Sequence, residues 1–197
     1  MTDIPVSVYD IIPYGGADSF LPSAELVLPT TTWSDNYVAV VPMFGLTTRT
    51  AVVPGSQWAQ IVAAEDNTVV KIVPRVDLPA GNGVSPAPAK AVTSHSLSAG
   101  AVVQWKREDD QPMEMTGSIA SSNRPVGFEG GNDYLCIDFS TSNNGGCDSA
   151  HQQVPPVSAL GNRYVVAPHP NRRSDGQQES IWYRIVGAVN RPGISGG

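Results

Sequence analysis

Two short apolar segments joined by a polar turn lie within residues 58–74, and they restrict the chain to a β fold. Residues 61–64 and 69–73 are apolar and contain several β-branched side chains, which are typical of strands. Residues 65–68 between them include Asp and Asn, whose side chains hydrogen-bond their own backbone and tolerate left-handed conformations. This pattern predicts a β-hairpin over residues 58–74.

Further strand candidates recur about every ten residues, which is the spacing of a β-sandwich or β-barrel. Proline or glycine ends most of them, in a chain with 19 Gly and 17 Pro. No apolar stripe has helical spacing, and residues 149–153 could form at most one helical turn. Residues 78–91, rich in Pro and Gly, are expected to form an exposed loop. We therefore predict an all-β, antiparallel β-sandwich with long loops and little helix. Its other strands are predicted at residues 6–12, 24–28, 37–41, 47–53, 92–97, 101–105, 115–120 and 126–129.

Part of this pattern returns near the C-terminus. Residues 182–190 align with residues 58–66, and residues 155–167 align with residues 28–40 at nearly the same separation. One interpretation is an internal duplication that gives two packed β units, and the other is chance similarity between short apolar segments. The duplication predicts a first β unit over residues 1–150, which includes the 58–74 hairpin and the Cys136/Cys147 loop. Residues 151–197 would begin a second, incomplete unit.

The charge distribution argues against nucleic acid as a partner. The formal net charge is −6 and the longest basic run is Arg172-Arg173, whereas binding to phosphates needs a basic face. No apolar run approaches the roughly 20 residues that span a bilayer. The first residues lack the basic start and apolar centre of a signal peptide, so any leader is expected to be absent from this sequence.

The two cysteines, Cys136 and Cys147, lie close together in sequence. A disulfide between them would stabilise the fold by about 3 kcal/mol and would require an oxidising compartment. The alternative is a pair of free thiols in a reducing compartment.

Cys147, Asp148 and His151 belong to the segment richest in potential ligands. With Cys136 and His169 they could supply zinc donors, although the spacing is not a zinc signature. Acidic residues nearby could offer oxygen atoms to calcium, but they lack the spacing of a dedicated calcium loop; these are Asp133, Asp138 and Asp148. A disulfide plus a hydrogen-bonded His151 explains the same residues with fewer demands. We therefore assign no metal, cofactor or catalytic residue, and the sequence contains neither a G-x-S-x-G motif nor a phosphate-binding loop.

Several phrases of the sequence, in this order, resemble the N-terminal domain of the IgG Fc-binding protein family. They are Val8-Tyr9-Asp10 with Pro13-Tyr14-Gly15-Gly16, Ala63-Ala64-Glu65-Asp66-Asn67-Thr68, Leu97-Ser98-Ala99-Gly100, Gly117-Ser118-Ile119 with Ser122-Asn123-Arg124-Pro125-Val126, and His151-Gln152-Gln153-Val154-Pro155-Pro156-Val157-Ser158-Ala159-Leu160-Gly161. The resemblance implies an extracellular or cell-surface β-rich module. Such modules occur in an animal mucus-associated protein and in many bacterial surface proteins. The family pattern assigns no residue of this chain to contact with IgG.

The resulting functional expectation is a non-catalytic extracellular module for binding or adhesion to macromolecules, with a protein or glycan ligand. One alternative is a structural subunit that forms homo-oligomers through open strand edges. A second alternative is a metal-dependent or thiol hydrolase centred on Cys147 and His151.

Overall fold

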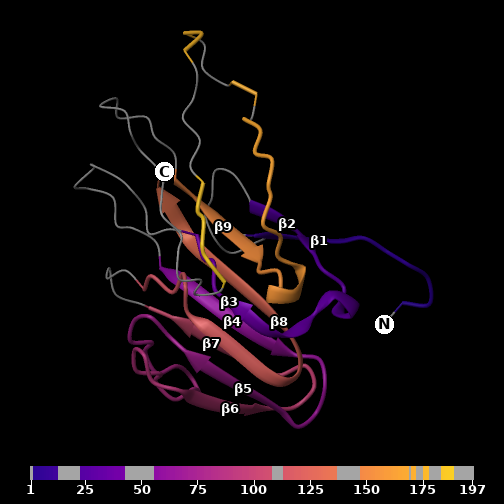
Figure 1. Ribbon diagram of the computed structural model, residues 1–197, viewed down its shortest axis with the longest axis vertical. Helices are drawn as coiled ribbons and strands as arrows, with labels where there is room; N and C mark the ends of the chain where they lie inside the picture. The colour runs from indigo at the N-terminus through magenta and orange to yellow at the C-terminus, as the bar shows by residue number, and fades with distance from the viewer. Residues whose placement is uncertain are drawn as a thin grey trace.

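The structure, a computed structural model, describes residues 2–12, 23–42, 56–107, 113–136, 147–168, 170–171, 175–177 and 183–188. Within these ranges the chain forms antiparallel β-strands and two 3-10 turns (Figure 1). The all-β prediction is confirmed: one large sheet curls into a half-barrel, and a small two-stranded sheet lies beside it. The strands are β1 Val8–Ile12, β2 Ser23–Val27, β3 Ser34–Val38, β4 Gln57–Ala63, β5 Thr68–Val73, β6 Thr93–Leu97, β7 Val102–Lys106, β8 Ile119–Cys136 and β9 Cys147–Gln153; the turns are η1 Thr30–Thr32 and η2 Val157–Ala159.

The long strand β8 is the axis of the large sheet. Along one side it pairs first with β5 and then with β4, and along its other side first with β3 and then with β9. β6 extends the sheet beyond β5, and β7 extends it beyond β4. The first half of β8 pairs with β3 and β5, and the second half pairs with β4 and β9. Because β8 is curved (Figure 1), these two parts of the sheet enclose one core.

The predicted hairpin over residues 58–74 is wrong in its pairing, although both strands form. β4 and β5 each pair with β8 and with an outer strand, and not with each other. The connection between them is instead fixed to an irregular part of β8. Asn123 accepts a hydrogen bond from the Val69 N–H at 2.6 Å and donates one to the Asn67 carbonyl at 3.1 Å. Pro125, which has no N–H for the ladder, lies in the same irregular stretch, where the register with β3 shifts.

The core lies on the concave side of the half-barrel. Burial alternates along β4, with Ala59, Ile61 and Ala63 inside and the residues between them less buried. Tyr37 and Phe128 meet there edge to face, with ring centroids 5.9 Å apart. Other fully buried members include Val70, Ile72, Leu78, Val103, Trp105, Met113 and Met115.

Three other local predictions are corrected. Residues 115–120 and 126–129 were expected as separate strands, but β8 runs continuously from Ile119 and absorbs the bend at Pro125. Residues 149–153, a candidate helical turn, belong to β9, because pairing with β8 satisfies their backbone groups. The 78–91 loop is irregular as expected, yet Leu78 and Ala87 are buried and joined to each other by two backbone hydrogen bonds. The strand predicted at residues 47–53 lies outside the described residues.

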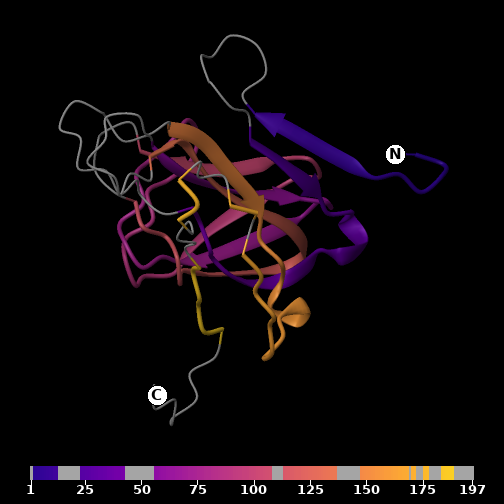
Figure 2. The ribbon, with the colours of Figure 1, turned by 90° about the horizontal axis from the view of Figure 1, so that it is seen from above.

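β1 and β2 form the small sheet, which lies beside β9 in both views (Figures 1 and 2). Two long-range hydrogen bonds attach it to β9. The Ser149 hydroxyl donates to the Ile12 carbonyl at 3.0 Å, and the Leu28 N–H donates to the Gln153 side-chain oxygen at 2.6 Å. Within the described part of the chain, no helix is long and apolar enough to cross a membrane.

Candidate functional site

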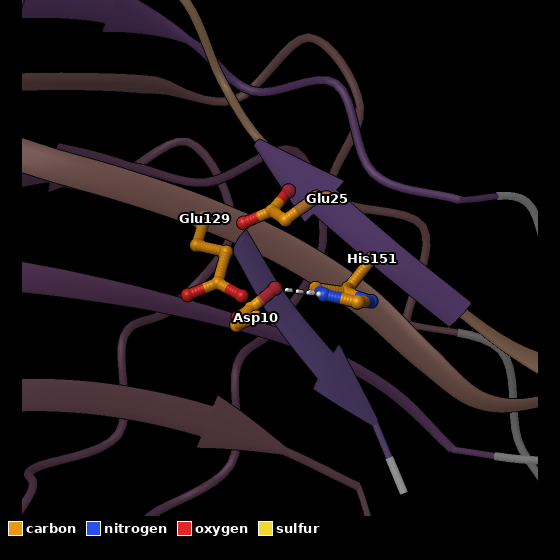
Figure 3. A group of neighbouring side chains, drawn as sticks. All are labelled: Asp10, Glu25, Glu129 and His151. Carbon is orange, nitrogen blue, oxygen red and sulfur yellow. Dashed lines mark hydrogen bonds and ion pairs between the residues drawn. The ribbon is translucent and has the colours of Figure 1, made fainter. Parts of the chain in front are cut away.

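Four ionisable side chains converge where the small sheet meets the half-barrel. Asp10 comes from β1, Glu25 from β2, Glu129 from β8 and His151 from β9 (Figure 3). One ligand atom from each lies within 4.8 Å of the corresponding atoms of the others. We call this group the four-strand cluster.

Strand register explains why these four residues meet. Asp10 and Glu25 are directly opposite each other in the β1–β2 ladder, so their side chains share one face. On the large sheet, Glu129 pairs with Gln153 and His151 pairs with Gly131, which places Glu129 and His151 on one face as well. Packing of the small sheet against β9 brings the two faces together.

His151 is the most buried member of the four-strand cluster. Its residue is 7% exposed and its side chain is fully enclosed. Nε2 lies 2.7 Å from an Asp10 carboxylate oxygen, and Nδ1 lies 3.0 Å from the Ser23 hydroxyl. Both ring nitrogens therefore have oxygen partners from the small sheet, and the imidazole connects the two sheets.

The two glutamates are held by donors from the large sheet. Glu25 accepts a short hydrogen bond from the Gln153 N–H. Glu129 accepts one from the Gln60 side-chain amide at 2.6 Å, and Gln60 in turn accepts one from the Gln104 amide at 3.0 Å. This polar ladder crosses three neighbouring strands and fixes the Glu129 carboxylate.

Burial and like charge raise the pKa of both glutamates. For Glu25, desolvation is the largest cause and the Glu129 carboxylate is the next. For Glu129, desolvation again leads, and the Asp10 charge adds to it, whereas the Gln60 hydrogen bond and His151 act in the opposite direction. The cluster thus gathers more negative charge than its one imidazole can balance, so it is suited to hold a proton or a cation.

A family model described as IgGFc binding protein matches residues 23–194. The chain belongs to this family. No curated protein and no solved structure gives a significant match to it. The family assignment makes the chain a binding domain, and its specific ligand is not identified by the match.

The residues that the sequence singled out lie in different parts of this IgGFc-binding domain. Cys136 and Cys147 are directly opposite in the β8–β9 ladder, at the end of the strand pair. Residues that face each other in an antiparallel ladder have Cα atoms about 4.5–5.5 Å apart, which lies within the disulfide range of about 4.4–6.8 Å. Their side chains and that of Asp148 lie outside the described residues, as do His169 and Asp138.

His151 occupies the four-strand cluster, and the partners seen around it differ from those that the sequence suggested. Asp133, a calcium candidate, forms an ion pair with Lys106 at 2.9 Å. The sequence did not identify Asp10, Glu25 or Glu129 as its neighbours, because each lies on a different strand far from residue 151. The available signal was a charged residue inside an otherwise apolar strand, as at Asp10 and Glu25.

Proposed function

We propose that this IgGFc-binding domain is an extracellular or cell-surface module that binds a protein ligand without catalysing a reaction. The family match over residues 23–194 carries this proposal, because it covers most of the β structure and the family is one of binding domains. The position of the binding surface is inferred from the two copies of the proposed duplication.

The two copies share a local turn. Pro29 and Pro156 each precede a three-residue 3-10 turn and have nearly the same backbone angles, with φ and ψ of −65° and 151° in one and −66° and 158° in the other. Trp33 and Leu160, which end the turns, are both extended. These parallels support an internal duplication of residues 28–40 at residues 155–167.

A tyrosine follows each turn and makes the same contact. The Ser34 N–H donates to the Tyr37 hydroxyl at 3.0 Å, and the Gly161 N–H donates to the Tyr164 hydroxyl at 2.8 Å. In the first copy the Tyr37 hydroxyl also donates to the Val126 carbonyl of β8 at 2.5 Å. Tyr37 thereby fixes β3 against its partner strand.

The copies differ in what covers them. Tyr37 is 1% exposed, whereas Tyr164 is 68% exposed and Val165, the next residue, is 92% exposed. No described residue forms a strand beside residues 163–167. We infer that a protein ligand binds here by adding a strand, as β8 does to β3.

Self-assembly is the second candidate function, since the added strand can come from another copy of the chain. The same exposed residues favour it. The two functions differ in whether the mass of the purified protein grows with its concentration.

Surface plasmon resonance with immobilised IgG Fc tests ligand binding. We expect the wild-type domain to bind Fc before and after enzymatic removal of its glycan, because the proposed partner is a polypeptide strand. The Val165→Lys variant should bind at least tenfold more weakly, since a charge replaces an apolar contact. Val92→Lys is the matched control, because Val92 is also an exposed valine, at 66%, and lies outside the proposed surface.

Equal binding of Fc by the wild type and by Val165→Lys would contradict the proposed surface. The absence of any binding would exclude IgG Fc as the ligand, and binding lost with the glycan would indicate a carbohydrate ligand. Light scattering over a concentration series examines the second candidate. Growth in mass that Val165→Lys abolishes and Val92→Lys retains would support strand-mediated self-assembly.

A further inference from the structure

We propose that Asp10, Glu25, Glu129 and His151 bind one divalent metal ion, and that Zn²⁺ is the ion whose ligand preferences they match best. This site is independent of the proposed protein-binding surface. It rests on the geometry, the charge and the hydrogen bonds of the four-strand cluster.

The spacing of the ligand atoms suits a metal ion. The four atoms lie within 4.8 Å of one another and come from four different strands. A tetrahedral Zn²⁺ with bonds of about 2.0–2.2 Å holds its ligands roughly 3.4 Å apart. Small side-chain rotations would bring the four atoms to that spacing, because all four already point into the same space (Figure 3).

The charge of the cluster matches a divalent cation. Three carboxylates face one imidazole, so even a protonated His151 leaves two negative charges unbalanced. A divalent ion would supply the missing positive charge where burial makes unpaired carboxylates unfavourable.

Existing hydrogen bonds orient the ligands in the way that metal sites require. Ser23 contacts Nδ1 of His151, which directs Nε2 toward the carboxylates. The Gln60 amide and the Gln153 N–H each contact one oxygen of a glutamate, so the other oxygen of that glutamate can face an ion. The fully buried imidazole sets this cluster apart from a group of surface carboxylates, and it favours Zn²⁺ over Ca²⁺, which prefers oxygen ligands.

Asp10 gives the site a route to solvent. Its side chain is 40% exposed, and it makes the 2.7 Å contact with Nε2 that a metal ion would replace. Metal binding therefore competes with the Asp10–His151 hydrogen bond.

Isothermal titration calorimetry with ZnCl₂ provides the test. The protein carries no affinity tag, is stripped with EDTA and has any free thiols alkylated, so that cysteines do not bind zinc. We expect one Zn²⁺ per chain, with CaCl₂ and MgCl₂ binding at least tenfold more weakly. Glu129→Gln should weaken Zn²⁺ binding at least tenfold, because it removes a charged ligand and keeps the shape of the side chain.

Glu65→Gln is the matched control and should bind Zn²⁺ like the wild type, since Glu65 is an exposed glutamate paired with Arg124 at 2.6 Å. Circular dichroism verifies that each variant is folded. If Glu129→Gln does not fold, Asp10→Asn gives the same comparison at a more exposed ligand. A wild type that binds no Zn²⁺, or folded variants that bind it as tightly as the wild type, would overturn the proposal.

Discussion

Gly131 and Trp58 show how a single residue shapes the outer face of the half-barrel. They are paired in the β4–β8 ladder, and the Trp58 ring lies over the glycine. A Cβ atom at position 131 would come within 2.2 Å of the ring. Trp58 is half-buried on the outer face, while Trp105 is the fully buried tryptophan among the described residues.

The first prediction concerns this close approach. Gly131→Ala should lower the free energy of unfolding by about 1–3 kcal/mol, because Trp58 must move to admit a methyl group. Urea denaturation measures the change. Gly187→Ala is the control, since a Cβ atom added there would meet no described atom within 4 Å beyond its chain neighbours, and it should change stability by less than about 0.5 kcal/mol. Equal stability of the two variants would contradict the packing argument.

His95 and Trp105 form a second residue-level pair. Their rings meet edge to face with centroids 5.5 Å apart, and neither His95 Nε2 nor Trp105 Nε1 has a hydrogen-bond partner among the described residues. Burial lowers the pKa of His95 below its ordinary value of 6.5. The folded protein therefore holds this imidazole in its neutral form.

The second prediction is a pH dependence of stability. In the unfolded chain His95 takes up a proton near pH 6.5, whereas the folded state resists protonation. The contribution of neutral His95 to the free energy of unfolding is therefore complete above pH 6.5, and it is lost as the pH falls through the pKa of the folded state. His95→Phe keeps an aromatic ring and removes the titration. Urea denaturation between pH 7 and 5 should show a smaller loss of stability for this variant than for the wild type. An unchanged slope would argue against a neutral His95.

At the scale of elements, strands were easier to predict than their partners. Seven of the nine strands in the described residues overlap segments that the alternation of apolar residues indicated. An eighth, β8, contains the predicted segment 126–129 and the last two residues of the predicted segment 115–120. β9 was missed because Ser, Gln and His dominate it, and its strand conformation depends on pairing with β8. The hairpin prediction was wrong for the same reason, since β8 supplies the ladder for both β4 and β5 from a distant part of the sequence.

The third prediction belongs to the end of the β8–β9 pair. The register that opposes Cys136 and Cys147 supports a disulfide, so the protein purified under oxidising conditions should be two hydrogens lighter than its reduced form. Replacing both cysteines by Ser should lower the free energy of unfolding by about 3 kcal/mol. The reduced wild type is the control and should match the double variant. Alkylation of two thiols without prior reduction would rule out the bridge.

At the scale of the whole molecule, the four-strand cluster exists only because two sheets meet. The large sheet supplies Glu129 and His151, and the small sheet supplies Asp10 and Glu25. The sequence singled out His151, but it could not provide the other three members, since no local spacing relates them. Likewise, the similarity between residues 28–40 and residues 155–167 is visible in the sequence, whereas the difference in their exposure depends on where β8 lies.

The sequence by itself determined the all-β class, the position of most strands and the family. Alternating apolar residues and frequent Pro and Gly act locally, through backbone geometry and the two faces of a strand. The tertiary structure alone decided which strands pair, how β8 curls the sheet and which ionisable side chains share one site. Those outcomes depend on hydrogen bonds and burial between residues far apart in the chain, and many pairings of the same strands satisfy the local pattern equally well.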